Sequence, residues 1–180
     1  MLDEPTDWTV ESPTRWIIAD LVSHEPYAYK DPRFSYTLNA WCPYLNRCKL
    51  VCVFRDPRVA ATSIVREVAL APYTQNLKIS ADHALRVWRA MYRQILDFHC
   101  TDDAQWLFIE YDQLITGTGH EVLSKFLDAE IDSGFVEQQL NRSQPIGRRL
   151  DSGVSELYER LKAKAEVTQA AVLRGGDRRS

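Results

Sequence analysis

The sequence predicts an α/β fold of three layers, in which helices cover both faces of a mostly parallel sheet. Short apolar runs alternate with helical patterns along the chain, which is typical of strands joined by helices. One run, residues 49–54, is rich in valine and is expected to be a strand buried on both faces. With 180 residues, 45% of them hydrophobic, the chain is expected to form one domain over residues 1–173, with a disordered tail over 174–180.

The N-terminal part predicts a helix, a short strand and an irregular helix. Residues 12–22 begin with Ser12 as N-cap and a proline at the first helical position, and they carry an apolar face. Residues 27–30 are expected to form a short strand. Residues 34–45 predict a helix interrupted near Pro43. Its aromatic side chains either pack on the sheet or line a pocket: Phe34, Tyr36, Trp41 and Tyr44.

The remaining elements continue the alternation. Residues 72–79 are predicted to be a loop, and Ser80 caps a long helix that reaches about residue 98. Residues 106–110 predict a second buried strand. Helices are expected over residues 119–127 and 155–173, so residues 116–120 are interpreted as a loop and helix N-cap.

The turn after residues 49–54 is a candidate anion site. Asp56 is a good N-cap and Pro57 suits the first helical position, so a helix begins where the strand ends. Free backbone N–H groups and the positive end of the helix dipole favour an anion there. Arg55 adds a guanidinium suited to phosphate, and Ser63 follows Asp56 by two helical turns on the same face.

Arg55-Asp56-Pro57 followed by Ser63 resembles the segment with which sulfotransferases hold the 3'-phosphate of 3'-phosphoadenosine 5'-phosphosulfate (PAPS). Residues 29–33 resemble the Lys-Asp-Pro segment of bacterial and tyrosylprotein sulfotransferases, and residues 108–114 resemble a family strand end. The resemblance extends over about residues 12–149. It implies a sulfotransferase fold that uses PAPS, without a metal, to transfer a sulfuryl group to a hydroxyl or amine.

The resemblance also implies site residues. Arg55 and Ser63 would hold the nucleotide, and Lys30 is the candidate catalytic cation, with an ion pair to Asp31 as the alternative. Asp31 is a candidate catalytic carboxylate; alternatively, it holds its turn together with Arg33 through backbone N–H bonds.

The motifs do not identify the catalytic base, nor a further residue that binds the 3'-phosphate. Glu11 and Asp31 are the carboxylates nearest in sequence to the motif. Arg148 and Arg149 stand where the family has a basic loop over the 3'-phosphate, and a solvated basic turn is the alternative.

The chain has no glycine before Gly117, so the glycine-rich loop with which the family holds the phosphosulfate is not found upstream of Arg55. We therefore expect either a sulfotransferase piece that begins after this loop or a non-catalytic remnant. Such a remnant would bind a 3'-phosphonucleotide or a partner protein.

Composition restricts the other possibilities. A net charge of −3 gives no case for nucleic-acid binding. No apolar run reaches the roughly 20 residues that span a bilayer, so a cytoplasmic protein is expected. The spacings of Cys42, Cys48 and Cys52 match no common zinc pattern, and two of these cysteines lie in apolar surroundings, so we expect buried thiols and no bound metal. The acceptor could be a phenol, a sugar or a peptide.

Overall fold

The computed structural model describes residues 11–74, 76–100, 103–132, 134, 144–147 and 149–175. Over these residues the chain is a mixed α/β protein, mostly helical, with a small parallel sheet of two strands. The chain forms two compact units. Unit 1 comprises Met1–Cys48 with Ala90–Thr101, and unit 2 comprises Lys49–Arg89 with Asp102–Ser180. The single domain expected over residues 1–173 stays a prediction.

Unit 1 contains the two N-terminal helices and the end of a third. These are α1 (Ser12–Ser23), α2 (Phe34–Trp41) with the 3-10 helix η1 (Cys42–Tyr44), and the π-helix η3 (Ile95–His99). The irregular helix interrupted near Pro43 is thus confirmed. In η3, the buried His99 ring lies with Nε2 3.0 Å from the Ser35 carbonyl oxygen and Nδ1 3.1 Å from Asn39 Oδ1. This histidine therefore connects η3 to α2.

Two predictions for unit 1 are wrong, and the apolar face predicted for its first helix is buried only in part. Residues 27–30 form no strand. In this segment Tyr27 stacks on Tyr29 with ring centroids 5.7 Å apart, and the Tyr29 hydroxyl donates to the Leu21 carbonyl at 2.9 Å. In α1 the N-cap is Glu11, which makes no side-chain cap bond. The predicted apolar face of α1 is largely exposed, at 75% for Trp16 and 59% for Ile17, whereas Ile18 is buried.

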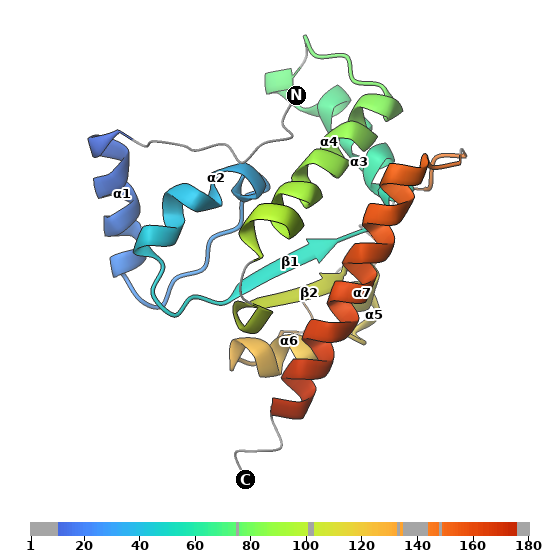
Figure 1. Ribbon diagram of the computed structural model, residues 1–180. Coiled ribbons are helices and arrows are strands. Elements are labelled where there is room, and N and C mark those ends of the chain that lie inside the picture. Colours follow the sequence, from blue (N-terminus) through green and yellow to red (C-terminus); the bar gives the residue numbers. More distant parts are fainter. Residues whose placement is uncertain are drawn as a thin grey trace. The chain divides into compact units, whose positions relative to one another are not determined.

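Unit 2 is organised around the sheet. Strands β1 (Leu50–Phe54) and β2 (Trp106–Glu110) run parallel, with Leu50 opposite Trp106 and Phe54 opposite Glu110 (Figure 1). Figure 1 also shows the long helix α7 (Ser152–Gly175) beside β2. Strand β2 is almost fully buried. β1 is not buried on both faces, since Val53 is 41% exposed. The predicted parallel pairing is confirmed, but the burial of β1 is only partial.

The helices of unit 2 mostly begin where the caps predict. Helix α3 (Pro57–Leu70) starts at the Asp56 cap and is followed by the 3-10 helix η2 (Pro72–Thr74). Helix α4 (Ala81–Gln94) follows Ser80, whose Oγ accepts the His83 backbone N–H at 3.2 Å. The 3-10 helix η4 (Asp103–Gln105) precedes β2.

A short helix after β2 was not predicted. Helix α5 (Tyr111–Thr116) is closed at its start by a capping box between Glu110 and Gln113. It ends at Gly117, whose φ of 81° favours glycine, and Gly119 then caps α6 (His120–Leu127). The interpretation of residues 116–120 as a loop and N-cap is therefore confirmed.

Side chains of α7 satisfy the backbone of β2. The Phe108 N–H donates to Thr168 Oγ1 at 3.1 Å, and Gln169 Nε2 donates to the Phe108 carbonyl at 2.9 Å. Gln169 also exchanges a pair of amide hydrogen bonds with Gln113 of α5, at 3.0 and 3.1 Å. The helix thus takes the place of a neighbouring strand at Phe108.

Candidate functional site

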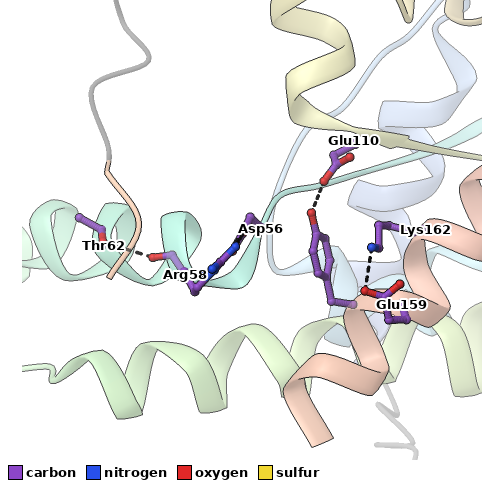
Figure 2. Close-up of polar contacts among 7 residues, drawn as sticks. Asp56, Arg58, Thr62, Glu110, Glu159 and Lys162 are labelled. Atoms are coloured by element: carbon purple, nitrogen blue, oxygen red, sulfur yellow. Dashed lines mark hydrogen bonds and ion pairs between the residues drawn. The ribbon is translucent and has the colours of Figure 1, made fainter. Parts of the chain in front are cut away.

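The turn between β1 and α3 is held by an ion pair between Asp56 and Arg58. Asp56 Oδ1 accepts the Arg58 backbone N–H at 2.8 Å, and Arg58 Nη2 contacts Asp56 Oδ2 at 2.6 Å. Figure 2 shows this pair at the start of α3. Burial alone would raise the pKa of Asp56, but the hydrogen bonds from Arg58 outweigh it and lower this pKa below its ordinary value. Asp56 therefore stays ionised and orients the Arg58 guanidinium.

The backbone at the start of α3 is less available than the sequence suggests. Pro57 has no N–H, and Asp56 accepts the Arg58 N–H. The N–H groups of Val59 and Ala60 both donate to the Asp56 carbonyl, at 3.0 and 2.9 Å. An anion at this turn would therefore be bound chiefly by side-chain cations, which corrects the expectation of free backbone N–H groups.

The side chain of Arg55 is fixed by an aromatic ring. Its guanidinium carbon lies 4.5 Å from the centroid of the Tyr111 ring. Arg55 follows β1 and Tyr111 follows β2, so the two parallel strands bring these residues to the same edge of the sheet. Ser63 lies half-buried within α3.

A pocket of about 380 Å³ adjoins the first turn of α3. The Ile146 N–H donates to the Arg58 carbonyl at 3.3 Å, which fastens the basic loop to α3. Arg149 of this loop is part of the pocket wall, whereas Arg148 lies outside the described residues. The described residues that line the pocket include neither Arg55 nor Ser63: Arg58, Arg149, Leu150, Ser155, Tyr158, Glu159 and Lys162.

Cations dominate this pocket. Arg58, Arg149 and Lys162 line it with one carboxylate, Glu159. Figure 2 shows the pair that Lys162 forms with Glu159, and their atoms are 2.7 Å apart. In the part of the chain that the structure describes, Arg149 makes no ion pair. The pocket therefore has a surplus of positive charge suited to an anion.

Tyr158 supports the pocket from α7. Its hydroxyl donates to the Glu110 carboxylate, and its ring packs edge-on against Phe54 with centroids 6.2 Å apart. Burial and the neighbouring Glu110 carboxylate raise the pKa of Tyr158, so the phenol stays neutral. Tyr158 thus connects α7 to the ends of both strands.

The other predicted site residues belong to unit 1. Asp31 pairs with Arg33, whose Nη2 lies 2.5 Å from Asp31 Oδ2, and it accepts the Arg33 backbone N–H at 2.8 Å. These contacts agree with the interpretation that Asp31 and Arg33 hold the turn together. The hydrogen bonds from Arg33 lower the pKa of Asp31 to about 2, which makes this carboxylate a weak proton acceptor at neutral pH. Lys30 is exposed beside it.

The candidate residues thus fall into two groups. Lys30 and Asp31 lie in unit 1, together with Glu11, the exposed N-cap of α1. Arg55, Ser63 and Arg149 lie in unit 2, where the structure adds Arg58 and Lys162. The sequence contained a signal for Arg58, since it follows Asp56 as Arg33 follows Asp31. For Lys162 there was only a position on an amphipathic helix.

No family model, curated protein or solved structure matches this chain. Among the described residues, no helix is long and apolar enough to cross a bilayer, and no group of three or more potential metal ligands occurs. All four cysteines are free thiols, and only Cys52 is buried, so the expectation of buried thiols is wrong for most of them.

Proposed function

We propose that the chain binds the 3'-phosphoadenosine part of PAPS in unit 2 and transfers a sulfuryl group from PAPS to a hydroxyl or amine acceptor. The proposal includes the three-layer sulfotransferase fold that the motifs resemble. One observation carries it: the Ile146–Arg58 hydrogen bond places the basic loop against the turn after β1, so that Arg149 and Arg58 line one pocket.

The chemistry of this pocket supports phosphate as the ligand. Arg58 and Arg149 offer planar donor pairs that match phosphate oxygens, and Lys162 adds a compact charge. Asp56 already orients Arg58, so part of the cost of ordering a long side chain is met before binding. The 3'-phosphate is the group that we assign to these cations.

Sulfuryl transfer also needs a cation near the leaving phosphate and an acceptor for the proton. Lys30 is the residue that we assign to the first task, as the resemblance implies. Asp31 is a poor candidate for accepting the proton, because its pairing with Arg33 lowers its pKa to about 2. The proposal therefore assigns nucleotide positioning to unit 2 and leaves the base unassigned.

A second candidate function is a non-catalytic domain that binds a 3'-phosphonucleotide or a partner protein. It is favoured by one observation: the hydrogen bonds from Arg33 lower the pKa of Asp31 to about 2, so this candidate base accepts a proton poorly. The enzyme and the domain that binds a 3'-phosphonucleotide share the 3'-phosphate site and differ in whether transfer occurs.

Calorimetric titration with adenosine 3',5'-bisphosphate, run beside adenosine 5'-monophosphate, tests the shared site. We expect a clear preference for the bisphosphate. Arg149→Gln should weaken bisphosphate binding by about 1.5 to 3 kcal/mol, the range for charge-assisted contacts, whereas Arg55→Ala, at a residue outside the pocket lining, should weaken it less. Arg66→Gln, which changes an exposed arginine of α3 away from the pocket, is the matched control.

The outcomes separate the alternatives. Equal affinity for the two nucleotides in a folded sample would contradict the 3'-phosphate site and would favour the domain that binds a partner protein. If only Arg55→Ala weakens binding, the 3'-phosphate lies at the end of β1 and the basic loop is a solvated turn. Transfer of sulfate from radiolabelled PAPS to a panel of phenols, sugars and peptides then distinguishes an enzyme from a binding domain.

A further inference from the structure

Unit 1 contains a pocket of its own, of about 510 Å³. This volume lies in the range of small-molecule sites, about 300 to 1,000 Å³. The pocket lies between α1 and α2 and is closed by the segment that joins them. Its lining is mostly apolar: Thr14, Ile17, Ile18, Leu21, Tyr29, Lys30, Asp31, Arg33, Phe34, Thr37, Ala40 and Trp41.

The two helices give this pocket different walls. Helix α1 contributes the aliphatic side chains of Ile17, Ile18 and Leu21. Helix α2 contributes Phe34 and Trp41, whose rings meet edge to face with centroids 5.1 Å apart. Tyr29 lies next to Trp41 at 5.8 Å. Aromatic walls of this kind favour a flat ring that makes offset or edge contacts.

The charged residues of the pocket come from residues 30–33. Arg33 and Asp31 form an ion pair, so their charges largely offset each other. Lys30 is exposed, and the ion pair of its neighbour Asp31 is made with Arg33. The pocket therefore combines apolar walls with one surplus cation. A long lysine side chain can place its ammonium in water while its stem lies along the apolar surface.

We propose that this pocket binds a small flat aromatic molecule that carries one anionic group, such as an aryl carboxylate or an aryl sulfate. The ring lies between α1 and α2, and the anion meets the Lys30 ammonium. All the lining residues belong to unit 1, and Lys30 is the one residue that this inference shares with the transfer chemistry proposed above.

Calorimetric titration of the full chain with three probes tests both parts of the proposal. The probes are 2-naphthoate, its neutral amide 2-naphthamide, and decanoate, an anion with an aliphatic chain. We expect 2-naphthoate to bind roughly fivefold more tightly than 2-naphthamide, the effect of one exposed charge pair, and more tightly than decanoate.

Variants assign these differences to residues. Lys30→Gln should abolish the preference for naphthoate over naphthamide and leave naphthamide binding unchanged, while Lys30→Arg should keep the preference. Lys78→Gln, at an exposed lysine outside the pocket, is the matched control. Ile17→Gln should weaken both naphthalene probes alike, because it changes the aliphatic wall. Circular dichroism checks that each variant is folded.

Several results would overturn the proposal. Equal affinity for 2-naphthoate and 2-naphthamide, or a preference that survives Lys30→Gln, would show that Lys30 does not recognise an anionic group of the ligand. Tighter binding of decanoate than of 2-naphthoate would show that the pocket prefers an aliphatic chain to an aromatic ring. If Ile17→Gln breaks up a dimer seen by sedimentation and leaves naphthoate binding unchanged, the pocket is an interface between two copies. Absence of binding by any probe to the folded chain would reject the site.

Discussion

The chain contains the same four-residue turn twice, once in each unit. Lys30-Asp31-Pro32-Arg33 precedes α2, and Arg55-Asp56-Pro57-Arg58 includes the N-cap and the first two residues of α3. In both turns the aspartate accepts the backbone N–H of the arginine two residues later at 2.8 Å, and the two side chains form an ion pair. The shared Asp-Pro-Arg sequence therefore gives the same aspartate–arginine contacts in both turns.

The surroundings of the two turns differ. The Arg33 side chain is 82% exposed and that of Arg58 is 45% exposed. Asp56 is the N-cap of α3 and follows a strand paired with β2, whereas α2 begins only at Phe34 and follows a segment without a strand partner. Residues near in sequence thus fix the turn itself, and long-range pairing fixes how firmly it is held.

The largest expected effect concerns the strand pair that supports the second turn. Thr168→Val should lower the free energy of unfolding of unit 2 by about 1 to 3 kcal/mol, because the buried Phe108 N–H loses its acceptor. Hydrogen exchange of amides in β1 and β2 measures this loss. Val167→Thr, at an exposed neighbour, should have little effect. An equal loss of protection in α2 would show that both turns depend on the same cooperative structure.

The two aspartates provide a direct test of the comparison. Asp56→Ala removes an N-cap and should cost about 1 kcal/mol of stability, measured by urea unfolding. Asp31→Ala removes a more exposed pair that caps no helix directly, so we expect less than about 0.5 kcal/mol. Equal losses would mean that the surroundings of the turns contribute nothing.

The helix after the first turn should respond to pH. Burial lowers the pKa of His99, so the folded state takes up a proton less readily than the unfolded state, whose histidine titrates near about 6.5. The contribution of His99 to stability is therefore complete above that pH and is lost as the pH falls below it. Exchange of α2 amides at pH 7.5 and 5.5 measures the change. His99→Gln should flatten this dependence, and an unchanged slope would assign it to other groups.

Much of the fold could be predicted from local sequence. The caps at Asp56 and Ser80, the interruption near Pro43 and the parallel strands follow from residue type and apolar runs. Residues 27–30 have strand-like composition, but a strand also needs a partner, which a sequence pattern does not reveal. Helix α5 was missed because it is only six residues long and depends on the Glu110–Gln113 capping box.

Part of the candidate site could also be predicted from local sequence. Arg149 could be found from its basic loop, and the structure places it in a cationic pocket. Lys162 could not be found, because which face of α7 lines that pocket depends on packing between distant segments. The stacking of Tyr111 on Arg55 was also missed, since it requires the register in which the two strands end together.

The hydrogen bonds between α7 and Phe108 join residues that are 60 and 61 positions apart in the chain. On the ribosome, β1 and β2 are complete long before Thr168 and Gln169 emerge. During that interval the backbone groups of Phe108 are available to other chains, as at any uncovered strand edge. Emergence of α7 from the ribosome is therefore the step of synthesis that ends this exposure, and a ribosome stalled before residue 168 would hold a chain prone to pairing with its neighbours.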